Sequence, residues 1–423
     1  MTNHDQHALK SKPTLPLHQT ERISELDLIR GFALLGILIV NMQYFSYPFI
    51  YTTISNIDLW PDVWDQAVKK GIVIFAQNKF NTMFSFLFGL GFMIFIQRAK
   101  QKGEQPARLF IRRLLVLLGI GLIHSYFIWA GDVLVFYSIM GFILLLFRNC
   151  QPKTLLTWAF SLIFIPVVLL TLLIVLILAT AGSASSASEL MPLELGRTII
   201  NGSLFTYSQG TYAAIFAQNA ADLNLVRIGY LSILPLFFAM FLFGAYAGKT
   251  EIFKNLAIHL SWIKKLWVCA LVIGLAITLP AVFVSPEFMG RSVHGLFQHI
   301  SYFVGGSALS LCYITSLILL TRKELWQRLL APLQAVGRMA ATNYLAQSII
   351  STFIFYSYGL GLYGKVSPAW AMLVCAAIFS FQIVISNWWM KRFAYGPVEW
   401  VWRTLTYGKK PPFKQRRSRD ISA

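Results

Sequence analysis

Long apolar runs, separated by short polar or basic stretches, recur along nearly the whole chain. Each run of about 20 residues is long enough to cross a hydrocarbon core of roughly 30 Å as an α-helix. A membrane β-barrel would instead need alternating segments of roughly ten residues, and these do not dominate. The pattern therefore predicts an all-α polytopic bundle with ten transmembrane helices, at 27–48, 72–97, 109–128, 132–148, 154–181, 224–247, 264–284, 297–320, 336–360 and 367–390.

Composition and charge agree with a membrane protein. Of the 423 residues, 57% are hydrophobic and only 13% are charged, about half the charged share of a soluble domain. A net charge of +19 is compatible with nucleic-acid binding, but the basic residues alternate between loops. That alternation is typical of membrane topology and places both termini in the cytoplasm. We therefore expect no nucleic-acid partner. The polar amino terminus holds no cleavable signal, so the first span should act as an uncleaved anchor.

The predicted spans divide the chain into a membrane domain and two tails. The tetrapeptide Phe-Leu-Phe-Gly occurs at 86–89 and 241–244, which suggests an internal repeat, although chance explains so short a match equally well. The predicted units are a cytoplasmic tail at 1–26, a transmembrane domain at 27–390 and a basic tail at 391–423. The transmembrane domain would consist of two five-helix halves, at 27–181 and 224–390, joined by an outer loop at 182–223. The outer loop is either a lid over an outward cavity or a solvated loop with one amphipathic helix.

Ionisable residues interrupt the apolar stretch from His124 to Gly141. Such groups are expensive in a bilayer and by default suggest a functional site. A short hairpin would bring His124 and Asp132 together as a general base and its orienting carboxylate, with Tyr137 on the return helix. The alternative is a neutral packed histidine with Asp132 as a helix N-cap.

A polar stripe descends the first predicted helix. Asp27, Arg30 and Asn41 follow the three-four spacing of one helical face. Asp27 could instead cap the helix, Arg30 could snorkel to the headgroups, and Asn41 could bond to another helix.

The carboxy-terminal third adds basic and amide side chains. Arg338, Asn343 and Gln347 lie at the entry to the ninth predicted span, where the two amides either contact a ligand or join helices. After the last span, Arg403 lies among tryptophans that could stack on a nucleotide, or it binds anionic lipid headgroups. The four cysteines are scattered singly. No His, Cys or acidic cluster has metal-ligand spacing, so we expect no metal site.

Three stretches of sequence resemble the YeiB-like family of bacterial inner-membrane proteins, which carries domain of unknown function 418. They are RISELDLIRGFALLGILIVNM, RRLLVLLGIGLIHSYFIWAGDVLVFYSIMG and, most specifically, GRMAATNYLAQS with SFQIVISNWWMKRFAYGPVEWVWRTLTYGK. The resemblance spans residues 22–409. It implies a multi-pass inner-membrane location.

The resemblance also implies an activity, because the family is grouped with transmembrane acyltransferases that move an acyl group from cytoplasmic acyl-CoA to an acceptor across the membrane. The pattern D-x-x-R-G followed by an asparagine is matched at Asp27, Arg30, Gly31 and Asn41. The histidine that those enzymes carry shortly afterwards is missing, since Met42 to Lys70 contains none. His124 would have to supply its role.

The leading hypothesis is thus a transmembrane acyltransferase with acyl-CoA as co-substrate and no permanently bound cofactor. Its partners would be membrane lipids and an envelope carbohydrate or lipid acceptor. The catalytic residues are expected to be His124, Asp132, Tyr137 and Asn41, and the donor-binding residues Asp27, Arg30, Arg338, Asn343, Gln347 and Arg403. Two alternatives stay open: a proton-coupled transporter or exporter, and a non-catalytic membrane scaffold.

Overall fold

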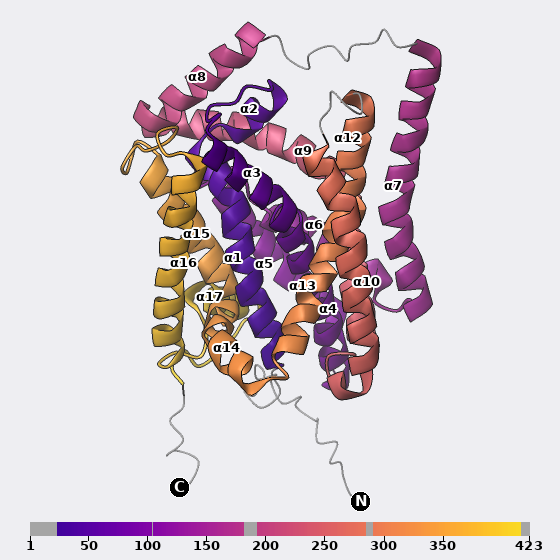
Figure 1. Cartoon of the computed structure of the whole chain (residues 1–423). Helices are drawn as coiled ribbons and strands as arrows, with labels where there is room; N and C mark the ends of the chain where they lie inside the picture. The colour runs from indigo at the N-terminus through magenta and orange to yellow at the C-terminus, as the bar shows by residue number, and fades with distance from the viewer. Residues whose placement is uncertain (1–22, 104, 182–192, 285–290, 416–423) are drawn as a thin grey trace, which may run out of the picture.

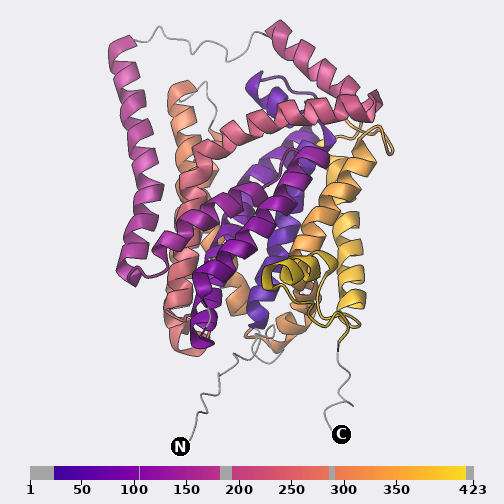
Figure 2. The same ribbon diagram turned by 180° about the vertical axis from the view of Figure 1, so that it is seen from behind.

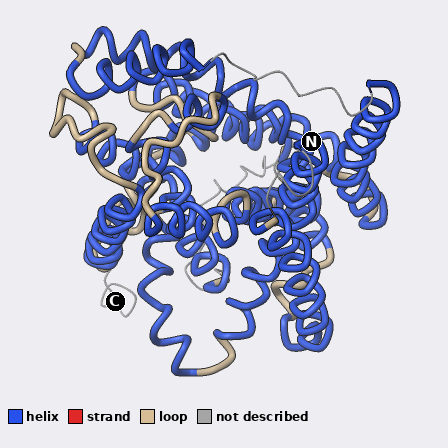
Figure 3. Tube along the Cα trace, turned by 45° about the horizontal axis from the view of Figure 1, so that its top comes forward, coloured by secondary structure: helices blue, strands red, loops and turns tan. Residues whose placement is uncertain are grey.

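The computed structural model describes residues 23–103, 105–181, 193–284 and 291–415. Most of this described part is helical, and it contains no strand beyond one isolated bridge between Phe393 and Lys414 (Figure 3). The prediction of an all-α membrane bundle is therefore confirmed.

The helices run mostly side by side along the long axis of the molecule (Figure 1). The first half contains α1 (Ser24–Ser46), α2 (Phe49–Ile54), α3 (Val63–Phe75), α4 (Lys79–Gln101), α5 (Pro106–Phe127), α6 (Leu134–Leu144) with the 3₁₀ turn η2 (Leu145–Phe147), and α7 (Pro152–Ala181). The second half contains α8 (Leu193–Gln209), α9 (Tyr212–Lys249), α10 (Leu256–Phe283), α12 (Arg291–Ile300), the π-helical turn η4 (Ser301–Gly305), α13 (Gly306–Leu320), α14 (Glu324–Arg338), α15 (Ala340–Phe355), α16 (Pro368–Met390) and α17 (Pro397–Tyr407).

Seven helical segments of the described chain are long and apolar enough to cross a membrane. They are Ser24–Ser46, Val63–Gln101, Pro152–Leu176, Tyr212–Lys249, Leu256–Phe283, Val293–Leu320 and Pro368–Met390. The other three predicted spans correspond to α5, α6 with η2, and α15. At a rise of about 1.5 Å per residue, α6 and α15 are each shorter than a hydrocarbon core of roughly 30 Å. The chain is a multi-pass membrane protein, and the count of ten stays a prediction.

The two Phe-Leu-Phe-Gly segments pack against each other at the centre of the bundle. A Cβ atom on Gly89 would lie 1.9 Å from the carbonyl oxygen of Phe241, and one on Gly244 would lie 1.9 Å from that of Phe86. The rings of Phe88 and Phe241 stack with centroids 4.6 Å apart. The repeated Phe-Leu-Phe-Gly tetrapeptide therefore lies where the backbones of α4 and α9 are in contact.

The two ends of the bundle differ. One end of the bundle, which we call the basic end, contains α14, α17 and the first turns of α1 (Figures 1 and 2). The other end, which we call the aromatic end, contains α2 and α8 (Figures 1 and 2). The predicted outer loop is represented there by α8 and the first turns of α9, while residues 182–192 of that loop lie outside the described part.

Candidate functional site

The basic end is built around a close contact between α1 and α14. A Cβ atom on Gly31 would lie 2.1 Å from the carbonyl oxygen of Leu333, and one on Gly337 would lie 1.8 Å from that of Asp27. Only glycines let the two backbones approach this closely. The contact holds Arg30 and Arg338, each next to one of these glycines, on the wall of the same cavity.

That cavity has a volume of about 330 Å³ and runs along α1 from Ile23 to Ile37, a distance of about 21 Å by helical rise. Asp27 does not cap its helix and instead pairs with Arg30 at 2.8 Å. Two carboxylates, Asp27 and Glu399, face six cationic side chains in the cavity lining: Arg30, Arg98, Lys102, Arg113, Arg338 and Arg403. The surplus of positive charge makes this end suited to an anionic ligand.

Aromatic side chains of α17 and α4 hold one of these cations. The Arg113 guanidinium lies 4.4 Å from the ring centroid of Trp402 and 5.6 Å from that of Phe95. The indole nitrogen of Trp402 donates to the carbonyl oxygen of Arg113 at 2.9 Å. The tryptophan that the sequence suggested for nucleotide stacking therefore stacks on an arginine of the same cavity.

A buried carboxylate fixes α17 against α15. The Glu399 carboxylate accepts hydrogen bonds from the backbone N–H groups of Ala341 and Thr342, at 2.7 and 3.1 Å, and from the Thr342 hydroxyl at 2.6 Å. Burial raises the pKa of Glu399 above its ordinary value, and these hydrogen bonds oppose part of the shift. Glu399 thus occupies the orphan donors at the start of α15.

His124 and Asp132 meet beyond the apolar inner end of the cavity. The Nδ1 atom of His124 lies 2.7 Å from Oδ2 of Asp132, and both side chains are about 1% exposed. The other carboxylate oxygen, Oδ1, accepts from the backbone N–H of Val135 at 2.9 Å. Asp132 therefore caps the start of α6 and orients the imidazole at once. The Nε2 atom of His124 is buried and has no hydrogen-bond partner among the described residues.

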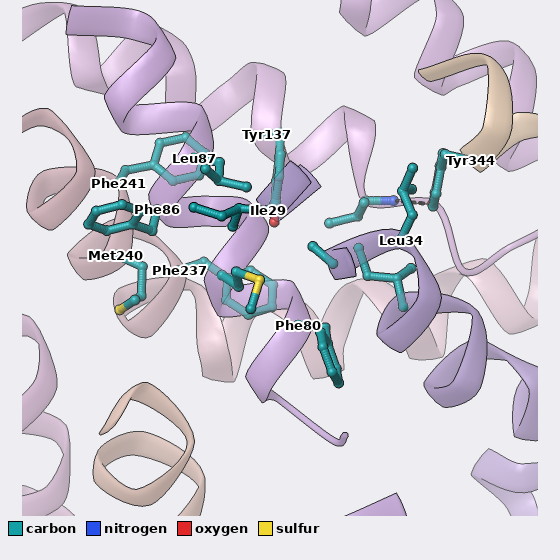
Figure 4. Close-up of a cluster of buried hydrophobic side chains, with 14 of the residues drawn as sticks. Ile29, Leu34, Phe80, Phe86, Leu87, Tyr137, Phe237, Met240, Phe241 and Tyr344 are labelled. Carbon is teal, nitrogen blue, oxygen red and sulfur yellow. Dashed lines mark hydrogen bonds between the residues drawn. The ribbon is translucent and has the colours of Figure 1, made fainter. Parts of the chain in front are cut away.

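Tyr344 connects this pair to the cavity, and the sequence interpretation gave it no role. Its ring centroid lies 5.4 Å from that of His124, and its hydroxyl accepts from the backbone N–H of Val133 at 3.3 Å (Figure 4). Both Tyr344 and Val133 line the cavity. Within the described chain the Tyr344 hydroxyl hydrogen has no acceptor. The motif GRMAATNYLAQS contains this tyrosine, but only the fold brings it to His124.

Tyr137 also lines the cavity, but its hydroxyl is engaged elsewhere. It donates to the carbonyl oxygen of Asn81 at 2.9 Å and lies 2.8 Å from the Ser85 hydroxyl. Tyr137 and Tyr344 occupy different places in the buried cluster (Figure 4). A donor role for Tyr137 toward a ligand would require it to leave α4.

The three amides expected at the site do not line the cavity. Asn343 donates to the Ser386 hydroxyl at 2.9 Å, and Gln347 donates to Oε1 of Gln382 at 2.9 Å. These bonds join α15 to α16, which is the interhelical alternative that the sequence left open. Asn41 is half-buried on α1, away from the cavity lining.

The geometry thus combines a cavity lined by cationic side chains, an apolar inner end and a buried imidazole–carboxylate pair. A histidine with one nitrogen on a carboxylate and the other free is arranged as a general base. Within the part of the chain that the structure describes, no group of three or more His, Cys, Asp or Glu side chains could hold a metal ion.

Comparison with known proteins gives a family and three relatives. The family model described as "Protein of unknown function (DUF418)" matches residues 247–409. The chain is 37% identical to "Uncharacterized protein YxaH" of Bacillus subtilis (strain 168), covering 96% of this chain and 98% of that one. It is 28% identical to "Uncharacterized 39.9 kDa protein in amylase 3'region" of Bacillus acidopullulyticus, over 96% and 99% of the two chains. Identity to "Uncharacterized protein YeiB" of Escherichia coli (strain K12) is 27%, over 94% of this chain and all of that one. No solved structure matches.

Proposed function

Because the chain belongs to the DUF418 family of YeiB-like membrane proteins, we propose for its site an activity that its geometry supports: acyl transfer from acyl-CoA to an acceptor in the cell envelope. The observation that carries the proposal is the cavity itself. Its mouth is lined by six cations, and its inner wall includes Tyr344, which packs on His124.

The donor would enter from the basic end. Arg30, Arg338 and Arg403 would pair with the CoA phosphates, because guanidinium groups bind phosphate oxygens in bidentate geometry. The thioester arm would follow the apolar wall formed by Leu34 and Ile37. A volume of about 330 Å³ is within the range of small-ligand sites.

The reaction would proceed at the inner end. Nε2 of His124 takes the proton of the acceptor hydroxyl, whose oxygen attacks the thioester carbonyl carbon. Asp132 stabilises the imidazolium, and the Tyr344 hydroxyl donates to the developing oxyanion. The carbon–sulfur bond then breaks, the proton passes from His124 to the leaving thiolate, and the products are an ester and free CoA.

The proposed orientation puts the basic end in the cytoplasm of a bacterium and the aromatic end outside its inner membrane, with ten spans and both termini inside. The support is the positive-inside rule, since most Lys and Arg residues of the described chain lie in or near the segments that join the helices at the basic end and in 391–415. Acyl-CoA is then on the correct side of the membrane.

A proton-coupled transporter is the second candidate, and the buried His124–Asp132 pair is the observation that favours it. Such a pair can relay protons between two sides of a membrane. A transporter moves its solute unchanged and responds to the proton gradient, whereas an acyltransferase forms a covalent product.

Radiolabelled acetyl-CoA supplied to inverted membrane vesicles from cells that express the protein tests the proposal. We expect label to enter envelope lipid or carbohydrate, to persist after the proton gradient is collapsed, and to fall to background with His124→Asn. Incorporation that is equal with and without the expressed protein would contradict acyl transfer.

A further inference from the structure

A second, smaller cavity lies at the aromatic end of the bundle. Its volume is about 30 Å³, enough for roughly two water-sized groups. Its polar and aromatic lining side chains are Tyr44, Tyr47, Phe49, Tyr51, Trp129, Tyr207, Asp222, Tyr356 and Tyr363. We call this set the tyrosine cage. The sequence interpretation singled out none of its tyrosines.

Asp222, on α9, is the one acidic side chain of the cage. Its Oδ1 accepts from the Tyr51 hydroxyl at 2.6 Å and from Gln218 at 2.8 Å, and its Oδ2 accepts from the Tyr207 hydroxyl at 2.7 Å. Across the described ranges no Lys, Arg or His side chain forms an ion pair with it. The carboxylate is hydrogen-bonded, but it has no counterion among the described residues.

Aromatic rings surround this charge. The ring centroid of Tyr207 lies 4.4 Å from that of Tyr356 and 4.8 Å from that of Tyr363. Ring faces attract cations, and a ring of aromatics with a carboxylate is a standard way to bind an ammonium group. A sugar ring would also stack on tyrosines, but about 30 Å³ is too small for one. Charge and size together favour a primary ammonium group.

The cage adjoins the proposed catalytic pair. Its floor includes Trp129, Ala130 and Gly131, the three residues that directly precede Asp132. The ring centroid of Trp129 lies 6.4 Å from that of His124. A ligand held in the cage is thus separated from the base by one short loop.

We propose that the tyrosine cage binds the ammonium group of the acyl acceptor, a molecule that carries both a primary amine and a free hydroxyl. The protonated amine is held by Asp222 and the rings and is not the nucleophile. The hydroxyl extends past the Trp129 loop to His124 and receives the acyl group, as in the reaction written above. This acceptor class rests on the proposed acyl transfer, whereas ammonium binding by the cage does not.

The test uses the purified full-length protein and three small probes. Ethanolamine, ethylene glycol and tetramethylammonium chloride are titrated at matched ionic strength, and the thermal unfolding midpoint is recorded. Ethanolamine should raise the midpoint in a saturable way. Ethylene glycol lacks the charge and tetramethylammonium is too large, so neither should do so. Equal responses to ethanolamine and ethylene glycol would overturn the proposal.

Variants separate binding from structure. Asp222→Asn should abolish the ethanolamine response, whereas Asp58→Asn should retain it, because Asp58 pairs with Lys69 outside the cage. If Asp222→Asn does not fold, substitutions of Tyr356 test ammonium binding instead. Tyr356→Phe keeps the ring and should keep binding, and Tyr356→Leu should weaken it by roughly 2-fold to 30-fold. Undiminished binding by Asp222→Asn or Tyr356→Leu would overturn the proposal.

Acetyl-CoA binding, measured on the same samples, separates this inference from the proposed function. Asp222→Asn should leave acetyl-CoA affinity unchanged. If acetyl-CoA binds and ethanolamine does not, the cage proposal fails and acyl transfer stands. If ethanolamine binds and acetyl-CoA does not, acyl transfer and the acceptor class fail, and the cage remains an ammonium site.

Discussion

Each oxygen of Asp132 has its own hydrogen-bond donor, the imidazole of His124 on one side and the start of α6 on the other. The sequence predicted that the two residues would meet, because a short hairpin separates them. It offered catalysis and helix capping as alternatives, and the structure shows that Asp132 serves both contacts. Tyr344 was not predictable in this way, since 211 residues separate it from Val133, to which it bonds.

The variant His124→Asn tests whether His124 is the general base. The asparagine amide can still donate to Asp132, so the carboxylate stays paired, but Nε2 is lost. We expect acyl transfer to fall by about 100-fold or more, as when a general base is removed, with acetyl-CoA affinity unchanged. Steady-state rates and calorimetric binding measure the two effects. His259→Asn on α10 is the control, and a comparable loss there would count against a specific role.

The two cavity tyrosines should behave differently. Tyr344→Phe removes a hydroxyl whose hydrogen has no acceptor in the described chain, so we expect acyl transfer to fall by about 100-fold. It also takes from the backbone N–H of Val133 its acceptor, which should cost about 1–3 kcal/mol of stability. Tyr137→Phe removes one donor to the carbonyl of Asn81, which still accepts from the Ser85 hydroxyl, so it should cost about 0.5–1.5 kcal/mol of stability while folded protein keeps its rate. Rates and unfolding midpoints of both variants check this. A loss of rate in Tyr137→Phe but not in Tyr344→Phe would show that Tyr137 donates to the oxyanion.

At the scale of elements, the apolar pattern predicted most helices but not how they pack. The spans at 132–148 and 336–360 were predicted from apolar content, yet α6 and α15 are short, because the chain turns at η2 and at Met339. The repeated Phe-Leu-Phe-Gly tetrapeptide was visible in the sequence, but its role as a helix contact depends on α4 and α9 being neighbours. Close backbone contacts occur at the glycines Gly31, Gly89, Gly244 and Gly337. The sequence does not reveal which residues lie next to these glycines.

Gly244→Ala tests the contact between α4 and α9. The added methyl group would overlap the carbonyl oxygen of Phe86, and overpacking of this kind costs about 1–3 kcal/mol or more. Gly229→Ala, on the same helix, meets no atom within 4 Å and should leave stability equal or slightly higher. Thermal unfolding of the two variants gives the comparison. Equal midpoints would refute the close packing.

The docking of α17 predicts a dependence of stability on pH. Burial raises the pKa of Glu399, so the folded state holds this proton at pH values where the unfolded state has released it. The contribution of Glu399 to the free energy of unfolding is therefore fully present below the ordinary glutamate pKa, and it is lost as pH rises through the raised pKa. Glu399→Gln should remove this part of the slope. The unfolding midpoint measured against pH checks it, and an unchanged slope in the variant would contradict it.

At the scale of the whole molecule, the two ends carry opposite chemistry. Arginines and lysines line the cavity at the basic end, and tyrosines with one carboxylate line the cavity at the aromatic end. The charge asymmetry was readable from the sequence, because Lys and Arg alternate between loops. The tyrosine cage was not, because only the fold assembles its members. They come from α1, α2, the loop between α5 and α6, α8, α9 and the segment after α15.

The central claim is that the basic cavity holds acyl-CoA, and calorimetric titration of acetyl-CoA into the purified protein tests it most directly. Wild-type protein should bind it, and Arg338→Gln and Arg403→Gln should each weaken binding by roughly 10-fold to 100-fold, as expected for the loss of a hydrogen bond to a charged group. Lys254→Gln, whose lysine pairs with Glu251 outside the cavity, should bind like wild type. Absence of binding at millimolar acetyl-CoA, or equal binding by all four proteins, would contradict the account.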